Sequence, residues 1–123
     1  MPTVKIEKLQ VLAVYSADLE RSKRFYIDHL GFEESGEMPP GVLMTGGGMT
    51  LYLEGGRAPR EGAALAHPEI CPCLDPGSVR EAHDRLAAAG VPIVEKLQVL
   101  GEQFAMTKIA DPDGNVLELA GKP

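Results

Sequence analysis

The hydrophobic positions in the first half of the chain predict one strand, one helix and then three more strands. Residues 4–15 are rich in Val, Leu and Ile, which is typical of a strand buried on both faces. Asp18 is predicted to cap a helix that ends at Gly31. The residues that recur at helical spacing, and so form one mainly apolar stripe along that helix, are Leu19, Ser22, Phe25, Tyr26 and Leu30. Strands punctuated by Pro- and Gly-rich turns are then expected over 32–37, 42–45 and 49–54.

The second half repeats this order. Residues 69–74 alternate as a strand does, and a helix is expected to start at Asp75 or Ser78 and to end at Gly90. Its stripe comprises Val79, Ala82, His83, Leu86 and Ala87. Strands are predicted over 93–97, 104–109 and 116–120, the last preceded by the tight-turn sequence Asp111-Pro112-Asp113-Gly114. The two halves are therefore degenerate copies of one β-α-β-β-β unit.

This repeat predicts an α+β fold in which two paired βαβββ modules form a cupped mixed sheet with outer helices. We expect a single domain over residues 1–123, with module one at about 4–54, a connecting loop at about 55–67 and module two at about 68–120. The concave surface is the expected place for function. Because such half-cups expose sheet edges, the pattern also predicts a homodimer.

Composition narrows the possible partners. Twelve Lys and Arg against eighteen Asp and Glu give a net charge of −6, the wrong sign for tracking phosphates. No stretch approaches the roughly 20 apolar residues that cross a bilayer, and residues 1–5 do not resemble a signal segment. We therefore expect a cytoplasmic protein that binds neither nucleic acid nor membrane. Cys71 and Cys73 are too closely spaced for a zinc ribbon and are expected to be reduced thiols.

Two motifs stand at opposite ends of the chain. The first is Asp18-Leu19-Glu20-Arg21-Ser22, followed by Phe25-Tyr26 and Leu30-Gly31-Phe32, and the second runs from Asp111 to Leu119. Together with the repeated order of elements they resemble the vicinal oxygen chelate superfamily, which includes glyoxalase I, bleomycin resistance proteins and extradiol dioxygenases. The resemblance covers nearly the whole chain and is specific for fold. It leaves the reaction open, because related folds isomerise, open epoxides, cleave rings or sequester drugs.

The resemblance implies positions for a divalent metal. Metal-dependent relatives offer one inward ligand from each of the first, fourth, fifth and eighth strands. Those positions fall here on Val11 or, with the register shifted by one residue, Gln10, and on Tyr52, Glu69 and Glu118. Only Glu118 matches, and no histidine occupies a ligand position. If Glu118, Glu69 and Gln10 converge, their oxygens favour Mg²⁺ or Mn²⁺ over Zn²⁺, while Ni²⁺ and Zn²⁺ are further candidates.

Glu118 and Glu69 are the candidate catalytic residues. Leu117 and Leu119 occupy one strand face, so Glu118 is expected to face the cavity, unless it pairs with Lys108 instead. Two carboxylates in one pocket would be coupled. The other expected ligand-contacting side chains are mainly apolar, aromatic or small, with one Lys: Tyr15, Tyr52, Cys71, Cys73, Phe104, Met106 and Lys108.

Two functions remain open at this point. One is a divalent-metal lyase, isomerase or dioxygenase acting on a vicinal-oxygen substrate, with Glu118 and Glu69 as ligand and base. The other is a metal-free protein that sequesters a small hydrophobic molecule. His67 near the cavity rim and Arg57 and Arg60 in the connecting loop are weaker candidates for ligand contact.

Overall fold

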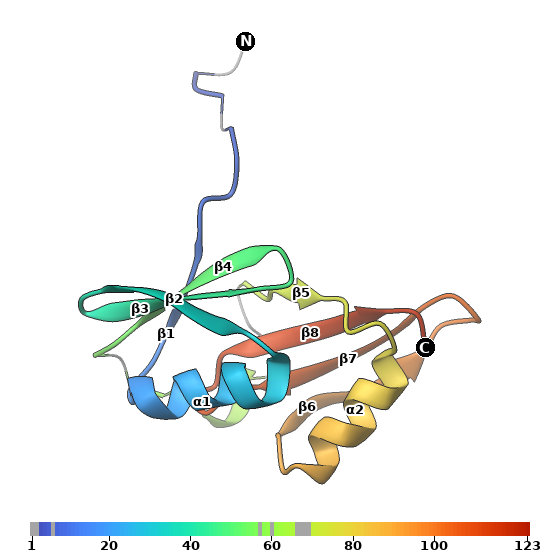
Figure 1. Ribbon diagram of the computed structural model, residues 1–123. Coiled ribbons are helices and arrows are strands. Elements are labelled where there is room, and N and C mark those ends of the chain that lie inside the picture. The colour runs from blue at the N-terminus through green and yellow to red at the C-terminus, as the bar shows by residue number, and fades with distance from the viewer. Residues whose placement is uncertain (1–2, 6, 57, 60, 66–69) are drawn as a thin grey trace.

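The computed structural model describes residues 3–5, 7–56, 58–59, 61–65 and 70–123. Within these residues the chain forms two mixed four-stranded sheets, each with one helix against it (Figure 1). This confirms the predicted fold class and the repeated β-α-β-β-β order. Neither described helix is long and apolar enough to cross a membrane.

The N-terminal sheet has the strand order β1-β4-β3-β2, with β1 parallel to β4 and the other pairs antiparallel. Its elements are β1 (Leu12–Tyr15), α1 (Leu19–Leu30), β2 (Glu33–Met38), β3 (Gly41–Gly46) and β4 (Met49–Glu54). The C-terminal sheet repeats this topology as β5-β8-β7-β6. Its elements are β5 (Cys73–Leu74), α2 (Val79–Ala88), β6 (Ile93–Val99), β7 (Ala105–Ala110) and β8 (Val116–Gly121). A short 3₁₀ helix, η1 (Gly62–Leu65), lies in the predicted connecting loop.

The helix ends follow from local chemistry. The Asp18 side chain accepts a hydrogen bond from the Arg21 N–H, as an N-cap does. Gly31 ends α1 in the left-handed region at φ 72°, where its missing Cβ removes the steric cost. Ser78 caps α2 by accepting from the Glu81 N–H, whereas Asp75 holds the preceding turn by accepting from the Gly77 N–H. Of the two predicted starts of α2, Ser78 is therefore the cap.

One hydrophobic core joins the two modules. Its buried side chains come from both sheets and both helices, among them Tyr26, Leu51, Leu53, Val79, Ile109 and Leu117. Because successive strand residues point to opposite faces, burial of Leu51 and Leu53 turns Tyr52 to the other face of the N-terminal sheet. Burial of Leu117 and Leu119 turns Glu118 in the same way on the C-terminal sheet.

Two strands are shorter than predicted. The strand expected over 4–15 begins at Leu12, because Leu12 pairs with Leu51 and residues before Gln10 run past the start of β4 at Met49. In Figure 1 the described residues before β1 lead away from the body of the molecule. The strand expected over 69–74 is described only as Cys73–Leu74, because Pro72 has no N–H to donate to a ladder.

Candidate functional site

A row of four side chains crosses the C-terminal sheet on the face opposite α2. In register, Cys73 lies opposite Glu118, Glu118 opposite Lys108, and Lys108 opposite Glu95. Registered partners share a face, so these side chains are neighbours. We call Cys73, Glu118, Lys108 and Glu95 the charged row.

Lys108 is the cation of the charged row. Its Nζ lies 3.0 Å from Glu95 Oε2. The hydrogen bond to Glu95, together with the charges of Glu95 and Glu118, raises the pKa of Lys108. The ion pair considered from the sequence, Lys108 with Glu118, is thus an interaction at longer range, and the close partner of Lys108 is Glu95.

Two thiols lie beside Glu118. Both cysteines are free, and Cys71 Sγ donates to the Val116 carbonyl at 3.5 Å. Burial raises the pKa of the Cys71 and Cys73 thiols, and the negative charge of Glu118 raises both further. Both thiols are therefore protonated at neutral pH, as weak donors beside a carboxylate.

The aromatic candidates are divided between the two sheets. Tyr15 and Tyr52 belong to the N-terminal sheet, where the Tyr52 hydroxyl donates to the Met38 carbonyl at 2.8 Å. Phe104 precedes β7 and is 41% exposed, close to the 40% of Tyr15. Met106 on β7 is half-buried. The sheets meet where the Asn115 side-chain amide donates to the Tyr15 carbonyl at 2.8 Å.

The metal ligands inferred from the resemblance are not brought together in the described residues. Gln10 and Val11 precede β1 and are exposed. Glu69, His67, Arg57 and Arg60 lie outside the described residues. Among the described residues, no group of three His, Cys, Asp or Glu side chains is placed to hold a metal ion. The ammonium of Lys108, registered opposite Glu118, also disfavours a divalent cation there.

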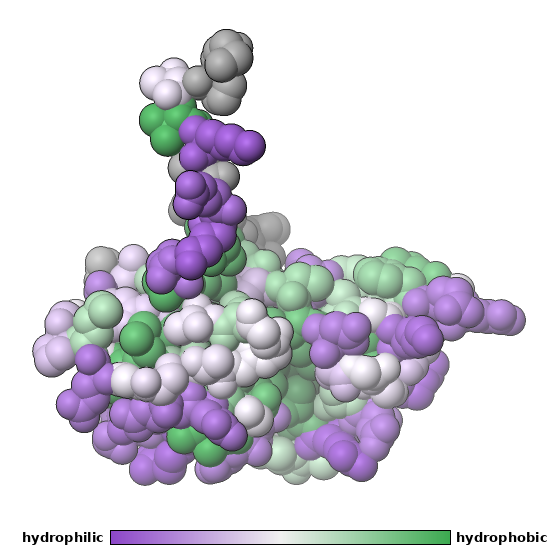
Figure 2. Space-filling view, turned by 45° about the horizontal axis from the view of Figure 1, so that its top comes forward, coloured by the Kyte–Doolittle hydropathy of each residue, from purple (hydrophilic) through white to green (hydrophobic). Residues whose placement is uncertain are grey.

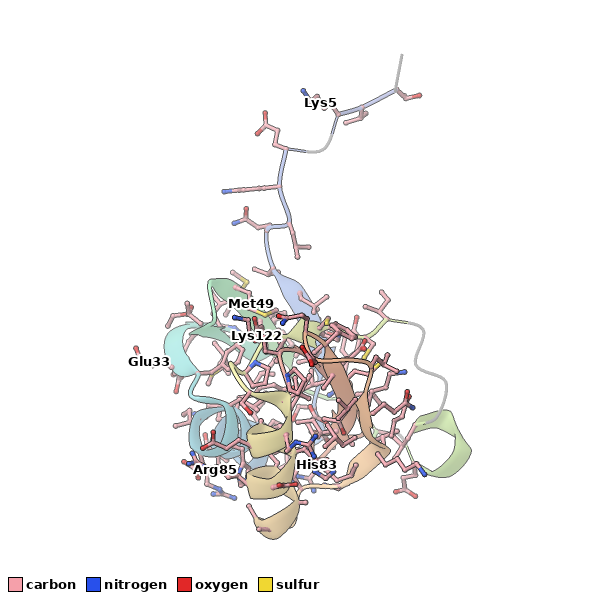
Figure 3. The ribbon with its side chains drawn as sticks, turned by 90° about the vertical axis from the view of Figure 1, so that its right-hand side faces the viewer. Lys5, Glu33, Met49, His83, Arg85 and Lys122 are labelled. Carbon is pink, nitrogen blue, oxygen red and sulfur yellow. The ribbon has the colours of Figure 1, made fainter. Side chains whose placement is uncertain are left out.

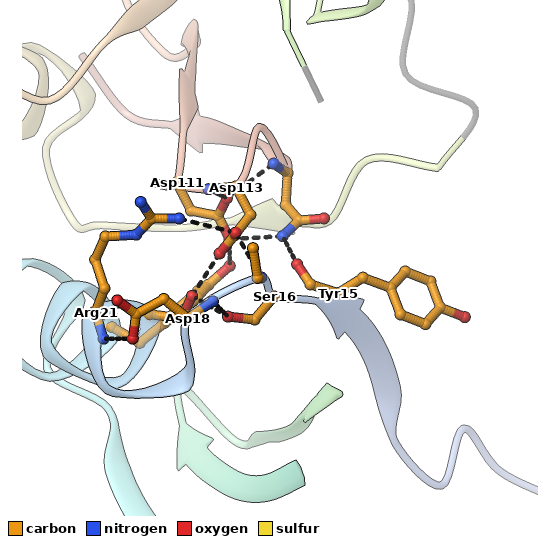
Figure 4. Close-up of polar contacts among 10 residues, drawn as sticks. Tyr15, Ser16, Asp18, Arg21, Asp111 and Asp113 are labelled. Atoms are coloured by element: carbon orange, nitrogen blue, oxygen red, sulfur yellow. Dashed lines mark hydrogen bonds and ion pairs between the residues drawn. The ribbon is translucent and has the colours of Figure 1, made fainter. Parts of the chain in front are cut away.

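The two motifs that carry the family resemblance bind each other. Figure 4 shows the carboxylate of Asp113, which is 3% exposed, accepting three hydrogen bonds from the start of α1. The donors are the Ala17 N–H at 2.7 Å, Arg21 Nη2 at 3.0 Å and the Ser22 hydroxyl at 2.6 Å. Buried carboxylates need such partners, so these contacts join module one to module two.

Asp111 completes this connection. Its Oδ2 accepts from the Tyr26 hydroxyl at 2.9 Å and from the Asn115 side-chain amide at 2.8 Å. Its Oδ1 accepts from the backbone N–H groups of Asp113 and Asn115. Burial raises the pKa of Asp111 and, with the nearby Asp111 charge, raises that of Tyr26 well above its usual value. We call this set of contacts the latch.

Sequence reasoning missed the latch. The buried members on α1 and on the β7–β8 turn are separated by about ninety residues, for example by 91 between Ser22 and Asp113. The available signal was the pairing of small hydroxyl residues in one motif with two aspartates in the other. Because the carboxylates of Asp111 and Asp113 are engaged by other protein groups, the two motifs serve the fold, although Arg21 Nε is buried without a hydrogen-bond partner among the described residues.

Comparison with known proteins agrees with this architecture. The family model described as "Glyoxalase/Bleomycin resistance protein/Dioxygenase superfamily" matches residues 8–119. Solved structures similar to the chain include a genomically encoded fosfomycin resistance protein, FosX, from Listeria monocytogenes, with 19% identity and a TM-score of 0.76 over 94% of this chain and 93% of that one. No curated protein matches the chain.

Two further structures show the same likeness. A glyoxalase/bleomycin resistance protein/dioxygenase from Alicyclobacillus acidocaldarius has 21% identity and a TM-score of 0.71, covering 92% of this chain and 89% of its own. Lactoylglutathione lyase from Agrobacterium tumefaciens has 24% identity and a TM-score of 0.66, covering 97% and 93%. At these identities the likeness shows the fold and leaves the chemistry to the residues.

Proposed function

Because the chain belongs to the glyoxalase/bleomycin resistance protein/dioxygenase superfamily, we propose that it binds a small, largely apolar molecule against the charged row without holding a metal. The observation that carries this proposal is the surroundings of Glu118. It lies beside Lys108 and two thiols with raised pKa. These groups can hydrogen-bond a ligand, and the positive charge of Lys108 beside Glu118 disfavours a divalent cation there.

The side chains around the charged row suit a planar or apolar ligand. Phe104 and Met106 lie at the start of β7, and Tyr15 lies at the end of β1 next to the turn that leads into β8. Aromatic and thioether side chains provide apolar contact area, while Glu118 can accept a hydrogen bond from a ligand hydroxyl or amine. Sequestration of such a molecule is the activity that these residues support best.

Binding of 1-naphthol, a planar alcohol, tests the ligand-binding part of the proposal. We expect its fluorescence to report saturable binding that Glu118→Ala weakens about tenfold, since a hydrogen bond to a charged group is lost. Phe104→Ala should also weaken it. Val94→Ala, a half-buried position on β6 outside the proposed contacts, is a matched control that should leave it unchanged. Equal affinities in all four proteins would refute this site.

Calorimetric titration with Mn²⁺, Ni²⁺ and Zn²⁺ tests the metal-free part. We expect no stoichiometric uptake that depends on Glu118. A divalent-metal lyase, isomerase or dioxygenase, with Glu118, Glu69 and Gln10 as ligands, predicts the opposite. In that case the wild type binds one metal ion and Glu118→Gln, which keeps the side-chain shape but not its charge, loses it. That result would overturn the proposal.

We also propose that the protein is a homodimer. β1 and β5 each form one edge of their sheet in the described part of the chain, with β2 and β6 at the opposite edges, and unpaired edges favour addition of another strand. The segment before β1 exposes Val4 and Leu9, and Val11 is 36% exposed. A second copy of the chain could cover these apolar side chains and the β1 and β5 edges.

A further inference from the structure

A cleft of about 900 Å³ lies between the two modules and meets the charged row only at Cys73. Its walls come from the C-terminal half of α1, the β3–β4 hairpin, β5 and α2. Leu30, Met49, Leu74, Leu86 and Leu119 provide its apolar lining. Figure 2 shows apolar surface running between more polar side chains near the middle of the molecule. Neither Glu118 nor Lys108 lines this cleft.

The internal repeat explains why a cleft forms there. Aligning the two helix caps, Asp18 with Ser78, places the latch donors of α1 on particular residues of α2. Arg21 then corresponds to Glu81, Ser22 to Ala82 and Tyr26 to Leu86. All three side chains of α2 line the cleft, and none of them carries an N–H or O–H donor.

The β7–β8 and β3–β4 turns also differ in the polar groups that they carry. The β7–β8 turn of the latch has five residues between its strands and carries two buried aspartates. The corresponding β3–β4 turn consists of Gly47 and Gly48, with φ of 58° and 78°. A two-residue glycine turn cannot reach α2 with a side chain. The cleft thus lies at the position that the internal repeat makes equivalent to the latch. There, α2 lacks the hydrogen-bond donors and the β3–β4 turn lacks the acceptors.

The rim of the cleft has an excess of negative charge. Asp75 Oδ1 accepts from the Gly77 N–H at 2.9 Å, while its Oδ2 has no hydrogen-bond partner among the described residues. Glu81 forms an ion pair with Arg85, so the cation of the rim is already engaged. Figure 3 labels Arg85 on α2 and Met49 on β4, two of the side chains that line the cleft. The lining therefore carries one uncompensated carboxylate above an apolar floor.

We infer that this cleft is a second ligand site, which takes a small molecule with an apolar body and an ammonium group. The apolar body replaces the missing turn between the modules, and the ammonium group lies at Asp75. Charge complementarity selects this class over an acid of the same shape, and the net charge of −6 of the whole chain acts in the same direction. Apart from Cys73, the residues of the charged row do not line this site.

Three probes of equal length test the inference: octylammonium, octanol and octanoate. In ¹⁵N NMR titrations of the full chain, octylammonium should bind saturably in the millimolar range and shift the amide signals of Met49, Ala82 and Leu119. Asp75→Asn, whose amide oxygen can still accept from Gly77, should weaken octylammonium binding about two- to fivefold and leave octanol unchanged. Octanoate should bind more weakly than both.

Filling the cleft provides the matched comparison. Ala82→Met should abolish binding of all three probes, because Ala82 lines the cleft. Ala87→Met, on the exposed side of α2, should leave binding unchanged. Thermal melts of both variants show that they are folded. Three results would each overturn the inference. The amine and the acid could bind equally, the signal shifts could be confined to the charged row, or the response could disappear as a second copy covers the cleft at high protein concentration.

Discussion

The thiols of Cys71 and Cys73 lie within the electrostatic field of Glu118. Because that charge raises the pKa of both, Glu118→Gln should lower both values and increase thiolate formation at pH 8. The pH profile of iodoacetamide labelling, followed by mass spectrometry, measures this shift. Glu95→Gln is the control for Cys73, whose raised pKa has no contribution from Glu95. An unchanged profile in Glu118→Gln would mean that the carboxylate is turned away from the sulfurs.

The ionisation of Tyr26 is coupled to folding. Its hydroxyl donates to Asp111 in a buried site, so Tyr26→Phe should lower the free energy of unfolding by about 2 kcal/mol at pH 7. The folded pKa is raised, so this contribution is complete below about pH 10 and is lost as the unfolded chain ionises above that value. Urea unfolding between pH 7 and 11 should show the two proteins converging. A constant difference would contradict the raised pKa.

The latch connects elements that are distant in the chain. Asp113→Ala removes the acceptor for Ala17, Arg21 and Ser22. We expect it to cost about 3 kcal/mol of unfolding free energy, because the buried Ser22 hydroxyl and two part-buried N–H groups lose this partner. Asp113→Asn, which keeps one acceptor oxygen, should cost less. The surface change Asp84→Asn should stay within about 0.5 kcal/mol. Denaturant titrations at pH 7 compare the three, and equal stability of all would show that the latch contributes nothing.

The two equivalent ends of the molecule differ in structure. At one end of the molecule the β7–β8 turn binds α1 through buried carboxylates, and at the equivalent end the β3–β4 turn leaves a cleft against α2. The contact between the β7–β8 turn and α1 holds the modules together, and the equivalent position between the β3–β4 turn and α2 leaves space for a ligand.

The proposed homodimer depends on the apolar segment before β1. If a second copy covers the segment before β1, Val11→Lys should weaken the dimer by placing a charge in an apolar contact. Gln10→Lys, the neighbouring position on the other side of an extended segment, is the matched control. Sedimentation velocity over a range of concentrations should show a dimer for the wild type and for Gln10→Lys and dissociation for Val11→Lys. A wild type that stays monomeric at high concentration would remove the basis of the proposal.

Local patterns in the sequence were sufficient for the elements and their order. Asp18 and Gly31 mark both ends of α1 because capping and the left-handed conformation depend on neighbouring backbone groups alone. The burial of Leu117 and Leu119 likewise follows from the alternation of a strand. The family resemblance rests on motifs of the same local kind, and the match over residues 8–119 confirms it.

Contacts between distant residues were decided only by the tertiary structure. The end of β1 depends on where β4 starts, and the partner of Lys108 depends on β6, so neither could be read from local spacing. Glu69 lies outside the described residues, so its proposed role stays a prediction. Two βαβββ modules could be predicted from the chain alone, because the period of the hydrophobic positions sets the type of each element. The packing of one module on the other decided that Asp113 would be buried against α1 and that Gly47 would border a cleft. Both outcomes depend on contacts between residues from distant parts of the chain.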